Sequence, residues 1–202
     1  MRLIGAKLLA CPLVLALAGH AFGNPTDAVD VPPELKRFVG KGESLRDYAA
    51  ADLNGDGLSD FVFVVEPKES GKESDEGEGP RTLKIAIRSA AGALSVVKEN
   101  RKAVYCRSCG GAFGDPLDAV ESSNKRFSIH HYGGSGWRWT NTATFAYSRR
   151  DNTWQLVSVE ASSFHASDPE KMETKTHRPP RSFGKIDIAD FDPDNYLGVG
   201  PK

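Results

Sequence analysis

The sequence predicts an all-β fold in a single domain, an antiparallel sandwich or twisted meander of about eight strands with one calcium loop. Short runs of β-branched and aromatic residues recur between turns rich in Gly, Pro and Asn. No long segment keeps the 3.6-residue spacing of an amphipathic helix. The length of 202 residues fits one domain, and no repeat period recurs, which excludes a complete propeller.

Residues 1–23 have the pattern of an export signal. Two cations precede a short apolar run at 8–18, and small residues follow. Cleavage is expected after Ala21 or after Gly23. No later segment has 18 consecutive apolar residues, so we expect a periplasmic or secreted protein with no transmembrane segment after cleavage.

Composition divides the remaining chain into a tether and a β domain. Residues 24–42 are expected to form an N-terminal tether, in which 34–39 can form one helical turn. Residues 43–202 are expected to form the β domain. Within it, 67–80 has almost no apolar side chain and predicts a mobile acidic loop.

The first strands are predicted from apolar patterning. Residues 61–65 form a continuous run of Phe and Val, which is typical of a buried strand. Residues 82–88 alternate apolar and polar side chains, so one face of that strand should be buried. An Ala-Gly turn at 91–92 then leads into a strand at 94–97, and the two strands form a hairpin.

The second half of the chain repeats this pattern. Residues 126–132 and 137–148 predict two strands, the second with apolar or aromatic residues at alternate positions. A polar turn at 149–152 separates them from a strand at 153–160. A last strand is expected at 185–188.

The charge balance excludes some partners. Lys and Arg number 26 against 27 Asp and Glu, which gives a net charge of −1. A nearly neutral chain has no overall attraction to nucleic acid or to an anionic membrane.

The segment 52–60 matches the pattern D-x-N-x-D-G-x-x-D of a calcium loop. The expected oxygen ligands are the side chains of Asp52, Asn54, Asp56 and Asp60 and the carbonyl of Leu58. Gly57 permits the sharp turn. Phe63 stands where an EF-hand has its bidentate Glu, and a strand follows instead of a helix, so the loop is not an EF-hand. The alternative is an acidic turn without metal. The ion is expected to fix the fold, because a catalytic ion would need an open position beside a substrate pocket.

Cys106 and Cys109 are the two cysteines left after cleavage. Three alternatives are open for them: a local structural disulfide, thiol–disulfide exchange, and zinc binding with His130, His131 or His165. The disulfide is favoured because exported thiols oxidise. Glycines follow the pair, where an exchange motif would need a helix.

The segment 130–139 places three glycines and a serine between two strands. A hairpin tip of this kind would display Tyr132, Ser135, Trp137 and Arg138 to a partner. In the alternative, the segment is a tight turn whose Trp137 and Trp139 pack into the core. A serine hydrolase is not favoured, because 133–137 breaks the G-x-S-x-G pattern at its last position. The carboxylates Asp168, Glu170 and Glu173 are expected on a solvated face.

Four segments carry a resemblance to known proteins: DLNGDGLSDFVFVVE, CRSCGGAFGDP, HYGGSGWRW and a later SFH followed by DP. They resemble a family of small exported bacterial proteins described as FG-GAP-like. They are also similar to periplasmic immunity proteins that protect bacteria from secreted peptidoglycan glycohydrolases and that have the fold of invertebrate-type lysozyme inhibitors. The resemblance implies calcium at Asp52, Asn54, Asp56 and Asp60. It also implies enzyme contacts by Tyr132, Ser135 and Arg138.

We therefore expect a non-enzymatic, calcium-stabilised periplasmic protein that inhibits a lysozyme-like toxin and acts as an immunity protein. Its partner would be a secreted or envelope protein and not a nucleic acid. The cleft of such an enzyme holds two carboxyl groups, which hydroxyl, N–H and guanidinium donors can complement. Two alternatives remain open: an envelope interaction module with an unrelated partner, and a thiol-redox or hydrolytic enzyme.

Overall fold

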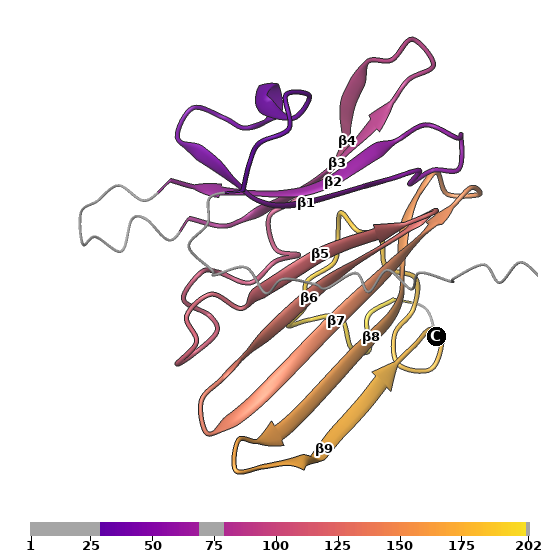
Figure 1. Ribbon diagram of the computed structural model, residues 1–202. Helices are drawn as coiled ribbons and strands as arrows, with labels where there is room; N and C mark the ends of the chain where they lie inside the picture. The colour runs from indigo at the N-terminus through magenta and orange to yellow at the C-terminus, as the bar shows by residue number, and fades with distance from the viewer. Residues whose placement is uncertain (1–28, 69–78, 201–202) are drawn as a thin grey trace, which may run out of the picture.

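The computed structural model describes residues 29–68 and 79–200, in which nine strands form two antiparallel sheets (Figure 1). The first sheet has the order β1-β2-β3-β4 and the second the order β5-β6-β7-β8-β9. The strands are β1 (Glu43–Ala51), β2 (Asp60–Pro67), β3 (Thr82–Arg88), β4 (Leu94–Asn100), β5 (Leu117–Ser123), β6 (Arg126–Gly134), β7 (Trp137–Ser148), β8 (Thr153–His165) and β9 (Asp168–His177). The predicted all-β sandwich is confirmed. The predicted signal peptide and most of the acidic loop 67–80 lie outside the described residues.

Each strand pairs with its neighbour in sequence, so both sheets are meanders. The predicted strands at 82–88 and 137–148 have the bounds of β3 and β7. The predicted strand at 185–188 is wrong. Only Asp187 forms a bridge, to Gln155, because this segment borders β8 briefly beyond the end of β9. A one-turn 3-10 helix, η1 (Lys36–Phe38), lies within the turn expected at 34–39.

The main core fills the space between the two sheets. The first sheet contributes Val62 and Val64 of β2, and the second contributes Phe127 of β6 and Phe145 of β7, all at most 1% exposed. The C-terminal segment after β9 adds Phe183, Ile186, Ile188, Phe191 and Tyr196. Burial of these aromatic and aliphatic side chains is the main source of stability.

A second apolar cluster covers the other face of the first sheet. Phe61, Phe63 and Val65 of β2 point to this side, and Leu35, from the described part of the predicted tether, packs against them with 0% exposure. Residues 29–42 therefore form a third layer. This layer explains why β2 is apolar at every position from 61 to 65, because both of its faces are buried.

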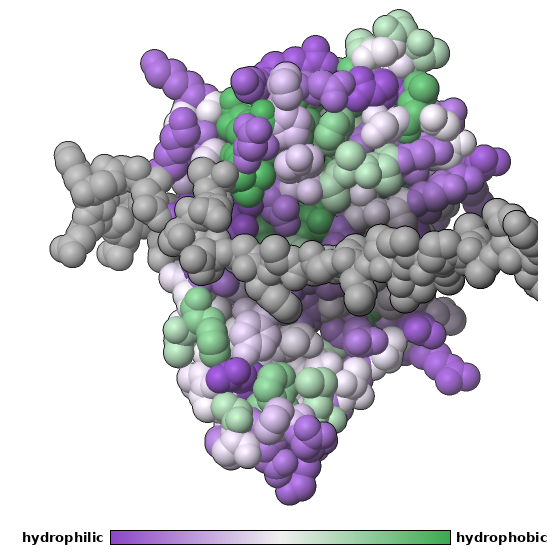
Figure 2. Space-filling view, in the orientation of Figure 1, coloured by the Kyte–Doolittle hydropathy of each residue, from purple (hydrophilic) through white to green (hydrophobic). Residues whose placement is uncertain are grey.

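The second sheet is longer than the first and projects past it (Figure 1). Strands β6 to β9 continue beyond the edge of the first sheet, and hydrophilic residues gather at the far end of this projection (Figure 2). On β7, Ala143 and Phe145 are buried, whereas Trp137, two positions beyond Trp139 on the same face, is 67% exposed. We call the part of the second sheet formed by residues 131–141 and 161–175 the overhang.

Candidate functional site

The carboxylate loop, residues 52–60, connects β1 to β2 at one end of the first sheet. Asp52, Asp56 and Asp60 each offer a carboxylate oxygen, and these oxygens lie within 4.8 Å of one another. The side chain of Asn54 lies beside them, since its Nδ2 donates to Asp56 Oδ2 over 3.0 Å. Three of the predicted ligand side chains thus lie in one cluster, and Asn54 contacts it. Leu58 lies in the same loop and donates its N–H to Asp56 Oδ1 over 2.8 Å.

Backbone geometry explains why the loop forms. Gly55 and Gly57 have φ of 83° and 87°, a region that side-chain-bearing residues rarely adopt. Their N–H groups therefore turn inward and donate to Asp52 over 2.6 and 3.0 Å. Leu53 is fully buried and its carbonyl accepts from the indole N–H of Trp154 over 2.9 Å, which fastens the loop to the second sheet.

The charges of the loop are only partly balanced. Burial acts to raise the pKa of Asp52, but the N–H groups of Gly57, Gly55 and Asp56 and the Lys125 ammonium hold it below its usual range. The pKa of Asp60 is raised, first by burial and also by the two neighbouring carboxylates. A hard cation among these oxygens would relieve the repulsion, so the cluster could hold a metal ion.

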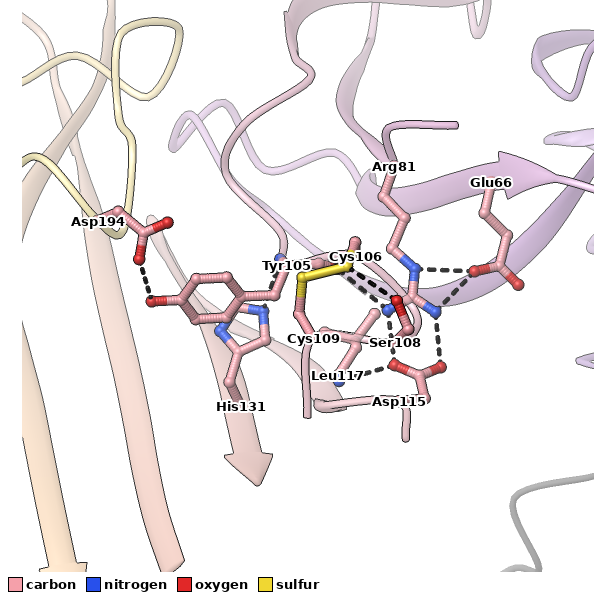
Figure 3. The surroundings of a disulfide bond; sticks show 10 residues. All are labelled: Glu66, Arg81, Tyr105, Cys106, Ser108, Cys109, Asp115, Leu117, His131 and Asp194. Carbon is pink, nitrogen blue, oxygen red and sulfur yellow. Dashed lines mark hydrogen bonds and ion pairs between the residues drawn. A yellow bond between two sulfur atoms is a disulfide. The ribbon is translucent and has the colours of Figure 1, made fainter. Parts of the chain in front are cut away.

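The structure contains the Cys106–Cys109 disulfide, with Cα atoms 5.1 Å apart (Figure 3). Of the three alternatives for these cysteines, it therefore disfavours zinc binding, which needs free thiolates. Among the residues that the structure describes, the carboxylate loop is the one group of three or more His, Cys, Asp or Glu side chains placed to share a metal.

A charged network beside the disulfide joins the two sheets (Figure 3). Arg81 is 2% exposed and donates to Glu66 of β2 over 2.8 Å and to Asp115, just before β5, over 2.6 Å. Arg107 also binds Glu66 over 2.7 Å, and Arg46 of β1 binds Asp115 over 2.9 Å. Burial opposes ionisation of Asp115, but its hydrogen bonds from Arg81 and Arg46 hold its pKa at about 2.

His131 on β6 lies next to this network and is 3% exposed. Its Nε2 accepts from the Tyr105 N–H over 3.4 Å, and the two rings are 4.7 Å apart. Burial, and then the charge of Arg81, lower the pKa of His131 to about 4. His131 is thus neutral near pH 7. It is a buried residue at the end of the core, where the overhang begins.

The structure brings the cysteine motif and the glycine-rich segment 130–139 together at the β6–β7 hairpin. The loop after the disulfide pairs with the hairpin, since Gly134 donates to Gly110 and Ala112 donates to Gly134, both over 2.9 Å. A Cβ on Gly133 would lie 2.6 Å from the Trp139 ring and 3.0 Å from the Gly110 carbonyl. Glycine at 133 thus permits the close packing of disulfide loop and hairpin.

The four predicted partner-binding residues lie on two faces of the hairpin. Arg138 donates to the Tyr132 hydroxyl over 3.0 Å and lies over the Phe113 ring at 4.9 Å. Trp137 projects from the opposite face, where its ring meets that of His165 at 5.3 Å. Ser135 is exposed in the turn between them, and the alternative that Trp137 packs into the core does not hold.

Sequence reasoning missed Phe113 and His165 as neighbours of this tip. Phe113 is 45% exposed and packs on Tyr132 with ring centroids 5.2 Å apart. Phe113 belongs to a glycine-rich loop, and the sequence separation from Tyr132 hides the contact. Together the features define a β-sandwich with a carboxylate loop at one site and an aromatic hairpin tip at another.

The sequence matches no protein-family model and no curated protein. A solved structure to which the chain is similar is described as "Structure of a Xanthomonas Type IV Secretion System related protein", with 16% identity and a TM-score of 0.36. The alignment covers 70% of this chain and 57% of that chain, so this chain spans little more than half of that protein.

Within residues 29–68 and 79–200, no helix is long and apolar enough to cross a membrane.

Proposed function

We propose that this chain is an exported, calcium-stabilised binding protein whose β6–β7 tip inhibits a peptidoglycan glycohydrolase, as an immunity protein does. The observation that carries the proposal is the exposure of Trp137, 67% at the turn of a projecting hairpin. Large aromatic side chains that stay exposed in a folded protein are frequent anchors of protein interfaces. Export to the periplasm rests on the signal-like residues 1–23.

The chemistry of the tip suits an acidic cleft. The Arg138 guanidinium donates to Tyr132 with Nη1 and retains further N–H donors for a carboxylate. Phe113 supplies apolar area on the same face as the guanidinium, Trp137 supplies it on the opposite face, and Ser135 adds a hydroxyl in the turn. A glycohydrolase cleft contains a pair of carboxyl groups, so a guanidinium beside an aromatic ring offers complementary charge and apolar contact.

The tip is held by contacts that form without a partner. The hairpin is paired to the disulfide loop through Gly110, Ala112 and Gly134, and the Gly136 carbonyl accepts from Ala166 over 2.8 Å. A recognition loop fixed in this way loses little conformational entropy on binding, which favours affinity.

Calcium is the ion that we assign to the carboxylate loop. Its donor set is all oxygen, which suits a hard cation, and calcium accepts irregular oxygen geometry better than magnesium does. The ion would fix the connection between β1 and β2, whose Leu53 is part of the main core. Its role would then be to stabilise the scaffold.

Inhibition is tested with purified protein lacking residues 1–23 and a panel of lysozymes of different types, by the clearing of a cell-wall suspension. We expect inhibition of at least one muramidase. Trp137→Ala and Arg138→Ala should each raise the inhibition constant about tenfold or more, as interface anchors do. Val97→Ala is the matched control, because Val97 is 48% exposed on the other sheet. Absence of inhibition across the panel, or inhibition unchanged in a protein that carries both substitutions, would refute the proposal.

Calcium binding is tested by thermal unfolding in calcium and in chelator. At calcium a hundredfold above its dissociation constant, the native state should gain about 2.7 kcal/mol, and the melting temperature should rise. Asp56→Ala should abolish this gain, whereas Asp118→Ala, at an exposed position of β5, should retain it. Equal melting curves of the unmutated protein in both conditions would contradict the assignment.

A further inference from the structure

A groove of about 320 Å³ lies on the inner face of the overhang. Its floor is formed by small side chains of β8, and larger side chains of β7 and β9 form its walls. Two cross-strand rows make this shape, Trp139–Ser163–Glu173 and Asn141–Ala161–Lys175. The concavity therefore follows from Ala161 and Ser163, which leave space between their neighbours.

One end of the groove is aromatic. Trp139 and Tyr105 meet edge to face with ring centroids 5.8 Å apart, and both line the groove. The Tyr105 hydroxyl donates to Asp194 over 3.0 Å, which fixes the ring (Figure 3). Trp137 lies on the same face as Trp139, roughly 6.7 Å further along the strand. Aromatic surface thus continues from the Tyr105 and Trp139 end of the groove toward the tip of the β6–β7 hairpin.

Some polar groups of the groove lack partners among the described residues. Asn141 Oδ1 is shielded from solvent and accepts no hydrogen bond there. A buried acceptor without a donor costs free energy, which a ligand donor would recover. Glu173 and Lys175 form no ion pair within residues 29–68 and 79–200, so their charged groups are available to a ligand.

We infer that this groove binds a β-linked pyranose chain. Saccharides present an apolar C–H face, which packs on aromatic rings. They also present a rim of paired hydroxyls, which form hydrogen bonds with amide, carboxylate and hydroxyl groups. Asn141, Glu173 and Ser163, which line the groove together with Trp139, supply these three groups. The open groove suits a chain, and one side chain of each charge gives no preference for a strongly charged ligand. This site is separate from the proposed inhibitory tip.

The test uses the chain without residues 1–23 and three probes: triacetylchitotriose, cellotriose and a soluble peptidoglycan fragment. Binding is measured by calorimetry and by tryptophan emission, since Trp139 lines the groove. We expect at least one probe to bind. Preference for chitotriose over cellotriose would indicate that Asn141 binds the N-acetyl group. Binding of the peptidoglycan fragment alone would indicate that recognition requires the muramyl unit.

Two pairs of variants, each with one change in the groove and one control outside it, test whether the saccharide binds in the groove. Ala161→Leu fills the floor and should lower the affinity at least tenfold, whereas Ala146→Leu makes the same change on the opposite face of the sheet and should not. Glu173→Gln should weaken binding several-fold, and Glu160→Gln, on the outer face, should leave it unchanged. Melting curves confirm that each variant is folded. If Ala161→Leu does not fold, the Glu173 pair decides.

Failure of every probe to bind at millimolar concentration would overturn the inference, as would binding that the groove variants leave unchanged. Neither result decides muramidase inhibition, which is measured separately and is tested at Trp137 and Arg138.

Discussion

Side chains alternate between the two faces along the whole of strand β7, but those on the inner face are fully buried in only one half of the strand. In the half that the first sheet covers, Ala143 and Phe145 point inward and are 2% and 0% exposed. In the half that belongs to the overhang, Trp137 and Trp139 point to the same side but have no sheet opposite them. Alternation thus sets which face a side chain takes, and the reach of the opposing sheet sets whether that face is buried in the core or stays exposed.

The sharpest test of this comparison exchanges aromatic residues for alanine in both halves. Phe145→Ala removes a ring from the core, where it packs on Phe127 and Phe191, and should cost about 3 to 5 kcal/mol of unfolding free energy. Trp137→Ala should cost about 0.5 kcal/mol or less, because the ring is 67% exposed. Urea unfolding measures both. Similar costs for the two would contradict the comparison.

The boundary between the halves is held by the charged network around Arg81. Arg81→Met leaves two partly buried carboxylates without their shared cation and should cost about 3 kcal/mol, the low end for a broken buried pair. The loss is limited because Arg107 still binds Glu66 and Arg46 still binds Asp115. Arg46→Met, whose side chain is 24% exposed, should cost less, about 1 kcal/mol. Denaturant unfolding that ranked the two variants in the opposite order would contradict this account.

His131 predicts a pH dependence at the same boundary. Its pKa is lowered to about 4 in the folded chain, while an unfolded histidine titrates near 6.5. The unfolded state therefore binds more protons between these values, so stability should fall as the pH falls from about 6.5 to about 4.

The full loss should be about 3 kcal/mol, measured as the unfolding free energy at each pH. His131→Gln, which keeps a hydrogen-bond acceptor for Tyr105, should flatten this part of the profile. A profile unchanged by the substitution would place the titrating group elsewhere.

The sequence predicts the strands that have a continuous apolar run or alternate apolar and polar side chains. It does not predict strands that lack both patterns. β2, β3 and β7 follow directly from their patterns. β9 has no apolar stripe and is exposed along most of its length, so its pairing with β8 leaves no trace in hydrophobic periodicity. The carboxylates Asp168 and Glu173 were expected on a solvated face, and the structure places Glu173 in the wall of the groove.

The sequence by itself determined the features whose parts are close along the chain: the alternation of the strands, the carboxylate cluster within nine residues, and the disulfide between two cysteines three positions apart. A local turn brings such groups together whatever the rest of the molecule does. The tertiary structure alone decided the overhang, the packing of the disulfide loop on the hairpin, and the groove that joins Tyr105 to Trp139 and Lys175. These features depend on where one sheet ends relative to the other, and that is set by the packing of residues far apart in the chain.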